Sequence, residues 1–263
     1  MNPACASKGY LKMEIISQVS GFEKVDIDSI GRDRIFSNRK DFKYLFGMIE
    51  LSRILSEMQK DYVLMTVDDV VQHEYHTHYF DTADLRFYND HHNGMLNRMK
   101  VRIRHYADGK AFVEVKKKNN RGLTFKKRIP LDGIPVGDIF ENEWMPMLDL
   151  PEHLQLELQL RVSYKRLTFY SRTWDEKVTI DTDLSYCREN CIDNILSVVI
   201  AESKGNDHQH SPFNMLMRSE RIRRTSFSKY CYGLSLLEPS VKKNNFKVLH
   251  HKALKIANAY ELA

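Results

Sequence analysis

Charged and apolar residues alternate in three consecutive short segments of this chain, KVRIRHY, AFVEVKKK and LTFKKRI. Side chains of a strand point to opposite faces with a period of two, so each segment is predicted to be a strand with one charged face. The charged positions are Arg102, Arg104, Glu114, Lys116, Lys126 and Arg128. Asp108-Gly109 is a two-residue hairpin signal, and the segment from Asn119 to Gly122 turns the chain again. The three segments are therefore predicted to form an antiparallel meander.

The same alternation recurs before and after this meander. Residues 35–46 are predicted to be a strand that carries Arg39, Asp41 and Lys43 on one face. Later strands are predicted over residues 154–171, 176–186 with Asp181 and Asp183 on one face, and 197–206 with Glu202 beside Lys204. Apolar residues at helical spacing predict helices over 48–59, 211–222 and 225–237. We expect an α+β fold: an antiparallel β-barrel of about eight strands that forms a charged tunnel, with helices packed outside.

One strand leaves its orientation open. In residues 154–171 the cation Arg166 falls on the same alternating positions as the apolar residues from Leu156 to Val162. Either a bulge intervenes, or the apolar part of this strand also points inward.

The charge pattern points to a polyanion as ligand. A solvated sheet does not require that several strands share one charged face, although cross-strand ion pairs could explain it. The net charge of +5, from 40 Lys and Arg against 35 Asp and Glu, is small for a protein that coats nucleic acid, so no nucleic acid partner is expected. The chain has no glycine-rich phosphate loop, so side chains must hold any phosphate. Arg can form two parallel hydrogen bonds to a phosphate (bidentate binding), and Lys supplies a single charge on a flexible side chain.

The carboxylates on the charged faces indicate a divalent cation. Glu114 shares a face with Lys116, and Glu202 with Lys204. Carboxylates beside a phosphate chain repel it unless a cation bridges them, and Mg²⁺ or Mn²⁺ binds both kinds of oxygen. The carboxylates on these faces, Glu114, Glu202, Asp181 and Asp183, thus predict a bound Mg²⁺ or Mn²⁺. His73, His76 and His78 have a spacing seen in metal sites, but no Cys or carboxylate completes a zinc site there.

The sequence indicates a cytoplasmic protein. No apolar run approaches the roughly 20 residues that cross a bilayer, and Lys12 and Glu14 interrupt any signal-peptide core. The four cysteines show no disulfide spacing, which fits a reducing compartment.

Eight segments in order resemble the VTC domain, the polyphosphate polymerase family within the CYTH-like triphosphate tunnel metalloenzymes. They are NRKDFKYLF, YFDTADLRFYNDHHNG, KVRIRHY, FVEVKKKNNRGLTFKKR, YKR, TIDTDL, VIAESKG and SFSKYCYGL. They cover roughly residues 33–237. We therefore expect a lead-in over 1–30, a tunnel domain over 31–238 and a basic tail with a helix over 239–263. The family's barrel has an inner wall of Lys and Arg, as the alternation suggests independently.

The resemblance implies a metal-dependent phosphotransferase that moves the γ-phosphate of ATP onto a growing polyphosphate chain. It implies that Lys43, Arg104, Lys116 and Glu202 serve catalysis. The phosphate ligands that it implies are Arg39, Arg102, Arg104, Lys116, Lys126, Arg128, Arg166, Lys204, Ser228 and Lys229. ATP and polyphosphate are the implied ligands, with Mn²⁺ or Mg²⁺ as cofactor. Glu202 matches the family's metal-binding glutamate, and we expect Glu202 and Glu114 as the metal ligands.

The sequence departs from the family in two respects. Asp41 stands where many tunnel enzymes have Glu. The SPX and transmembrane regions of the eukaryotic polymerase are missing, so coupling to a membrane would need a separate membrane protein. Two other functions stay open: a tunnel triphosphatase, although such enzymes carry more glutamates, and a non-catalytic polyphosphate- or RNA-binding module. RNA binding would add stacking aromatics to the charged face, where Tyr164 is the exception.

Overall fold

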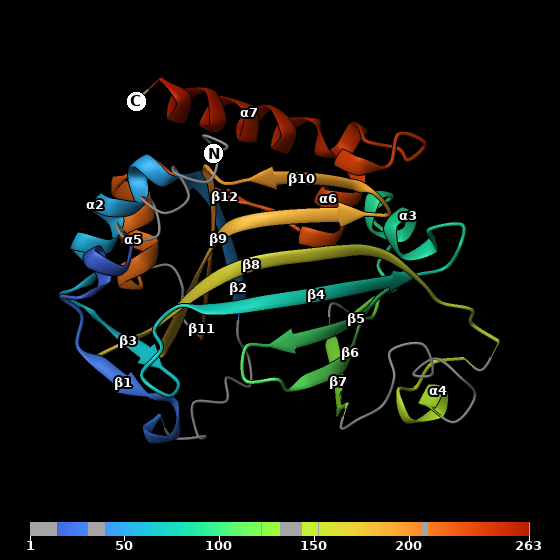
Figure 1. The fold of residues 1–263 in the computed structure, drawn as a ribbon, viewed down its shortest axis with the longest axis horizontal. Helices are drawn as coiled ribbons and strands as arrows, with labels where there is room; N and C mark the ends of the chain where they lie inside the picture. The colour runs from blue at the N-terminus through green and yellow to red at the C-terminus, as the bar shows by residue number, and fades with distance from the viewer. Residues whose placement is uncertain are drawn as a thin grey trace.

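The computed structural model describes residues 15–30, 40–121, 123–131, 144–151, 153–206 and 210–262. Twelve strands of this part of the chain form one sheet, with helices at its margins (Figure 1). The strands are β1 (Lys24–Asp26), β2 (Lys40–Gly47), β3 (Tyr62–Thr66), β4 (His73–Asp81), β5 (Arg98–Tyr106), β6 (Ala111–Lys118), β7 (Thr124–Pro130), β8 (Glu157–Ser171), β9 (Glu176–Arg188), β10 (Cys191–Ile195), β11 (Val198–Gly205) and β12 (Arg224–Thr225). The helices are η1 (Ile27–Ser29), α2 (Met48–Met58), α3 (Arg86–His92), α4 (Trp144–Met147), α5 (Pro212–Ser219), α6 (Lys229–Leu237), η3 (Asn244–Phe246) and α7 (Lys247–Glu261).

The main path of the sheet is antiparallel and runs in the order β12-β2-β11-β9-β8-β4-β5-β6-β7. Only the short β1 pairs in parallel, with β3, among the strands that the structure describes. The predicted antiparallel α+β fold is thus confirmed, with more strands than the eight expected because short strands extend the sheet. Within the described chain the path has two ends, β12 and β7, so hydrogen bonds do not close the barrel. The sheet instead bends, and β2 runs steeply behind β8 and β4 in Figure 1.

The predicted three-stranded meander is confirmed as β5, β6 and β7. Its registers place Glu114 opposite Arg102 on one side and Arg128 on the other. Val101, Ile103 and Val113 fill the other face, where each is at most 1% exposed. The alternation therefore separates a cation-rich face from an apolar face, as the sequence predicts.

A large apolar cluster lies on the face of the sheet that α2 and α5 cover. The helix predicted over 48–59 is confirmed as α2, and its buried side chains Leu51, Ile54 and Leu55 are 0% exposed. They pack with Phe169 of β8 and Phe213 of α5. Figure 1 shows both helices together at one end of the sheet.

A bulge within β8 resolves its open orientation. Tyr79 of β4 pairs with Leu160 but Phe80 with Leu158, so Gln159 is an extra residue on β8. Leu156 and Leu158 therefore pack with the apolar cluster of the meander. A second bulge lies in β9. Ser163 pairs with Ser185 but Lys165 with Thr182, so β9 has one residue more than β8 across this step, and Asp183 there has a φ of 52°. From Leu160 onward the apolar residues of β8 share the face of Tyr164 and Arg166, where α6 packs on them and covers one end of the cavity.

The bulge in β9 shows that one predicted facing is wrong. Asp181 and Asp183 are predicted on one face, but Asp181 contacts Arg166 inside the cavity while Asp183 pairs with Lys165 at 2.5 Å. The extra residue reverses the facing of every later side chain in β9.

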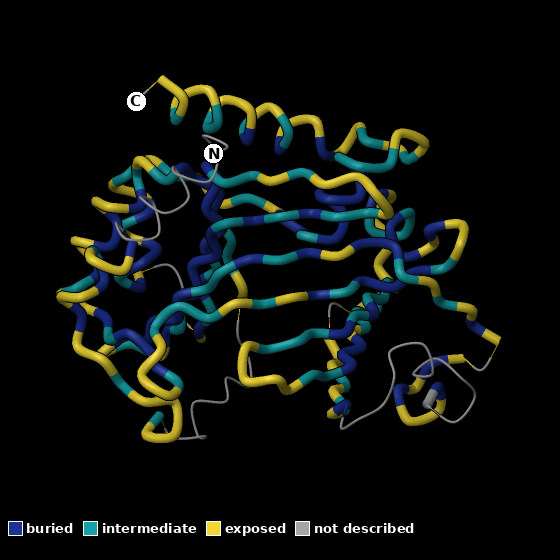
Figure 2. The backbone as a smooth tube through the Cα atoms, viewed as in Figure 1, coloured by how far each residue is buried: buried dark blue, intermediate teal, exposed yellow. Residues whose placement is uncertain are grey.

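The C-terminal helix α7 lies along β2 and β11, although the sequence indicates no place for it in the core. Leu249 and Ala253 of α7 are buried, while Figure 2 shows that most of the helix is exposed. The division of the chain near residues 30 and 238 stays a prediction. No helix of the described chain combines the length and the apolar character that crossing a membrane requires.

Candidate functional site

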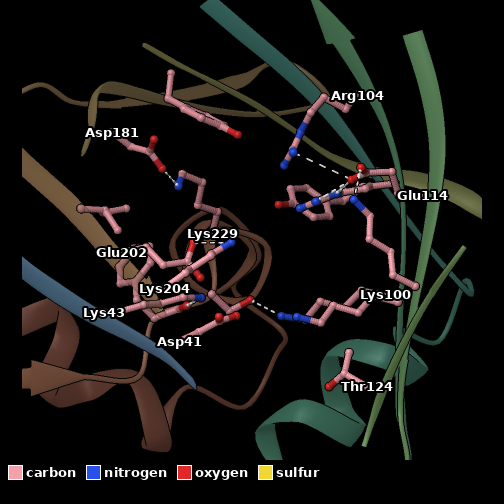
Figure 3. A pocket seen from close by; sticks show the side chains of 18 of the residues that line it. Asp41, Lys43, Lys100, Arg104, Glu114, Thr124, Asp181, Glu202, Lys204 and Lys229 are labelled. Atoms are coloured by element: carbon pink, nitrogen blue, oxygen red, sulfur yellow. Dashed lines mark hydrogen bonds and ion pairs between the residues drawn. The ribbon is translucent and has the colours of Figure 1, made fainter. Parts of the chain in front are cut away.

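The charged faces of the strands surround one cavity of about 850 Å³, shown in close-up in Figure 3. Its charged lining is strongly unbalanced, with ten basic residues against four acidic ones. The basic residues are Lys40, Lys43, Lys100, Arg102, Arg104, Lys116, Lys126, Arg166, Lys204 and Lys229. The acidic residues are Asp41, Glu114, Asp181 and Glu202. An enclosure with this excess of positive charge is suited to a ligand with several negative charges.

The structure brings together eleven of the thirteen predicted site residues. These are Lys43, Arg102, Arg104, Glu114, Lys116, Lys126, Arg166, Glu202, Lys204, Ser228 and Lys229. Arg128 does not line the cavity, because its guanidinium carbon lies 3.5 Å from the centre of the Phe112 ring. Arg39 lies outside the described residues.

Sequence reasoning missed several residues of the cavity wall. Lys100 alternates in phase with Arg102 and Arg104, so extending the pattern two residues back would have found it. Lys40 lies between Arg39 and Asp41, so the alternation assigns it to the opposite face of the strand and does not mark it as a site residue. The alternation places Asp181 on a charged strand face but gives it no role in the site.

Four cations surround Glu114, which is 2% exposed. Its carboxylate lies 2.5 Å from Arg102 and 2.6 Å from Lys126, with Arg128 at 3.7 Å and Arg104 at 3.9 Å. Burial alone would raise the pKa of Glu114, but the charges of Arg102 and Arg104 outweigh it and lower the pKa to about 2. Glu114 is therefore an ionised counter-ion that holds this cluster of cations in place.

Asp181 does the same for a second cluster across the cavity. Arg166 donates to both of its oxygens, at 2.5 and 2.8 Å, and Lys229 contacts one of them. Burial again opposes ionisation, yet Arg166 and Lys229 lower the pKa of Asp181 to about 2. The guanidinium of Arg166 also lies over the stacked rings of Tyr75 and Tyr164, 5.1 and 5.2 Å from their centres. These contacts fix Arg166 in one orientation.

Glu202 belongs to a looser charge pattern on the neighbouring strands β11 and β2. Glu202 pairs in register with Lys43, and Lys204 with Asp41, so acids and bases alternate on this wall. The Lys204 nitrogen lies 3.5 Å from Glu202, farther than Arg102 and Lys126 lie from Glu114. Burial would raise the pKa of Glu202, but Lys204 and Lys43 lower it well below its usual range. Glu202 is thus ionised and faces the cavity (Figure 3).

Several lysines of the cavity are crowded by other cations. Burial, together with Lys43, Lys116 and Arg102, lowers the pKa of Lys100 to about 8. Burial also lowers the pKa values of Lys116 and Lys126. Lys100 donates to the Ser228 hydroxyl at 2.9 Å. Burial is the main cause of these shifts and neighbouring cations add to it, so a polyanion bound beside these lysines would favour their charged forms.

The two predicted metal ligands do not form one site. Glu114 and Glu202 lie on opposite sides of the cavity in Figure 3, and Arg102 and Lys126 contact the carboxylate of Glu114. Among the described residues there is no group of three or more His, Cys, Asp or Glu that could hold a metal ion. Glu202, with Asp41 diagonal to it across the strand pair, offers the kind of sparse carboxylate wall on which Mg²⁺ is held when substrate phosphates and water complete its shell.

Fold and cavity together define an antiparallel sheet that encloses a cavity lined mainly by side-chain cations. The VTC-domain family model matches residues 38–238, and the chain belongs to this family. The resemblance inferred from the eight sequence segments is thereby confirmed.

Other comparisons add little. A solved structure of the adenylyl-cyclase candidate HpAC1 from Hippeastrum, described with a dominant triphosphatase activity, aligns at 12% identity over 76% of this chain and 98% of that one, with a TM-score of 0.46. The siderocalin Ex-FABP aligns at 10% identity over 58% of this chain and 84% of that one, with a TM-score of 0.16. No curated protein matches. Neither structural likeness is strong enough to carry a functional argument.

Proposed function

We propose that this protein is an ATP-dependent polyphosphate polymerase. The observation that carries the proposal is the excess of cations around one cavity, ten against four, in a chain of the VTC-domain family. Two of the four acids, Glu114 and Asp181, are neutralised by arginine and lysine within the wall. A cavity that must hold many phosphates without cleaving them to water benefits from such a wall.

The two ion-pair clusters provide the phosphate grip. Arg166 and Lys229 form one cluster with Asp181, and Arg102 and Lys126 form the other with Glu114. In the proposed reaction a terminal oxygen of the polyphosphate chain attacks the γ-phosphorus of ATP. The bond from that phosphorus to the oxygen that bridges to the β-phosphate breaks, and ADP leaves with the electron pair.

Positioning and charge stabilisation supply most of the rate of such a transfer. We assign this role to Lys43, Arg104 and Lys116, which face the same cavity. Lys43 is held by a 2.8 Å hydrogen bond from its nitrogen to the Phe227 carbonyl oxygen, so its charge is placed before substrate arrives.

We assign the divalent ion, Mg²⁺ or Mn²⁺, to Glu202, and Glu114 to the cation cluster instead. Bound there, the ion would neutralise charge on the phosphates of ATP. Asp41, paired in register with Lys204 on the same wall, is the second carboxylate of this region. The chemistry of the wall thus fits a metal whose remaining ligands are phosphate oxygens and water.

The test is an incubation of purified protein with ATP and either Mn²⁺ or Mg²⁺. Products are sized on a gel, and free phosphate is measured in parallel. Long chains with little free phosphate are expected. Free phosphate without chains would instead identify a triphosphatase, and tight polyphosphate binding without turnover would identify a binding module. A membrane protein that receives the chain stays an expectation from the family resemblance.

A further inference from the structure

A second cavity, here called the arginine pocket, has a volume of about 700 Å³. It lies outside the cation-lined cavity, which is called the tunnel from here on. Arginines dominate the lining of the arginine pocket, which consists of Tyr44, Arg218, Arg221, Ile222, Arg223 and Arg224. None of these described lining residues is acidic. All four arginines are exposed to solvent, so the pocket is open to a ligand.

The arginine pocket and the tunnel lie on the two faces of one strand. Lys43 of β2 points into the tunnel, whereas the next residue, Tyr44, lines the arginine pocket. The pairing of β12 with β2 sets Arg224 opposite Tyr44 and Thr225 opposite Lys43. The chain then enters the tunnel wall at Phe227. The segment that carries the four arginines therefore continues directly into the tunnel without sharing its cavity.

The local structure holds these arginines at the pocket at an energetic cost. Arg221 has a φ of 58°, in the left-handed region at the end of α5, where glycine would be unstrained. The turn is fixed by hydrogen bonds from Arg221 N–H to the Arg218 carbonyl, at 3.0 Å, and from Ile222 N–H to the Met217 carbonyl, at 2.8 Å. The guanidinium carbon of Arg224 lies 3.6 Å from the centre of the Phe42 ring. A strained arginine in a helix-ending turn points to a use for its charge.

The nearest acid in sequence does not neutralise the pocket. Glu220 is the one carboxylate within residues 218–224, and its oxygens accept hydrogen bonds from Arg53 Nε of α2 at 2.8 and 3.0 Å. Four guanidinium groups thus share one pocket while this carboxylate pairs with another helix. Guanidinium groups bind phosphate oxygens in two-bond forks, so a ligand with several phosphates would match them.

We propose that the arginine pocket is a second binding site for a linear oligophosphate, separate from the tunnel. The ligand has two sources: the protruding part of a chain whose other end lies in the tunnel, or a separate short oligophosphate. The proposal concerns the outer face of β2 and does not depend on the reaction inside the tunnel.

The test is isothermal titration with tripolyphosphate in EDTA, which removes divalent ions and prevents turnover. Wild-type protein should bind two equivalents. In the variant Arg221→Gly/Arg223→Ala one equivalent should keep its affinity, and the other should bind at least about tenfold more weakly, a change of about 1.4 kcal/mol. Arg221→Gly relieves the left-handed strain, so this single variant keeps the fold and carries the test if the double variant unfolds. Arg161→Ala removes another exposed arginine, from β8, and should keep both sites.

A second arm separates the two sources. If one chain spans both sites, Arg221→Gly/Arg223→Ala should weaken the binding of long polyphosphate far more than that of tripolyphosphate in the tunnel. If the ligands are separate, both lengths should lose only the pocket equivalent. Either result supports the pocket. Three results would overturn the proposal. They are a single equivalent in wild-type protein, a second equivalent that keeps its wild-type affinity in the double variant, and a loss of affinity in Arg161→Ala equal to that in the double variant.

Discussion

Arg166 and Asp181 form a two-bond ion pair inside the cavity, with both side chains almost fully enclosed. The pair joins two neighbouring strands, because Arg166 of β8 lies opposite Asp181 of β9. It gives Arg166 a fixed direction and leaves Lys229 shared between Asp181 and the cavity. If Arg166 binds phosphate as proposed, Asp181 holds it in place, and the two roles can be tested separately.

Arg166→Ala should reduce stability by about 3–5 kcal/mol, because it leaves Asp181 buried beside only Lys229. The double variant Arg166→Ala/Asp181→Ala should regain part of this stability but not the affinity for tripolyphosphate. Urea unfolding and titration calorimetry of both variants measure the two effects separately. Wild-type affinity in the double variant would contradict a phosphate-binding role for Arg166.

Glu202→Gln should abolish turnover with ATP while it leaves the metal-free affinity for tripolyphosphate within about tenfold of wild type. The amide removes the ionised oxygen that would hold the divalent ion but keeps the side chain's size. An activity assay with ATP and the divalent ion measures turnover, and calorimetry in EDTA measures the metal-free affinity for tripolyphosphate. Glu74→Gln, at an exposed carboxylate of β4, is the matched control and should keep full activity. Unchanged turnover in Glu202→Gln would show that Glu202 is not a metal ligand.

Binding of tripolyphosphate should take up protons at mildly alkaline pH. The pKa of Lys100 is lowered to about 8 in the unliganded protein, and a polyanion beside it would raise this pKa. Above about pH 8, Lys100 is then mostly neutral before binding and charged after it, so affinity should fall as pH rises through this range.

Calorimetry at pH 8.5 in buffers of different ionisation enthalpy counts these protons. Lys100→Arg keeps the positive charge at every pH and should reduce the proton uptake. An uptake that is the same in wild type and Lys100→Arg would show that other groups cause it.

Gly233→Ala should destabilise the protein by about 1–3 kcal/mol. A β-carbon on Gly233 of α6 would lie 2.2 Å from a ring carbon of Tyr186 and 2.9 Å from Leu160. Helix α6 carries Lys229 and begins beside Ser228, so its displacement should also weaken phosphate binding.

Thermal unfolding and tripolyphosphate titration measure both effects of Gly233→Ala. Gly94→Ala is the comparison, because a β-carbon there meets nothing within 4 Å. Its smaller cost should come from the left-handed backbone alone, and its phosphate affinity should be unchanged. If Gly233→Ala and wild type bind tripolyphosphate equally well, the packing of α6 does not affect phosphate binding.

The alternation along the sequence determined which side chains share a face. It is sufficient to place Arg102, Arg104 and Lys116 on the charged side of their strands, since the two-residue period of a strand is a local property of the backbone. The order of eight segments also determined the family. The same reasoning failed at Asp183, because a single bulge residue reverses the period and leaves no mark in the pattern.

Tertiary structure alone decided the partners of each charge. The sequence could not show that Arg102 and Lys126 contact Glu114, which is why we propose the metal at Glu202 instead. The sequence also could not show that Glu220 pairs with Arg53 instead of with the arginines of the pocket, since 167 residues separate Arg53 from Glu220. Whether a carboxylate is neutralised or left facing a ligand depends on distance, burial and cations brought from other strands, and only the folded chain fixes these.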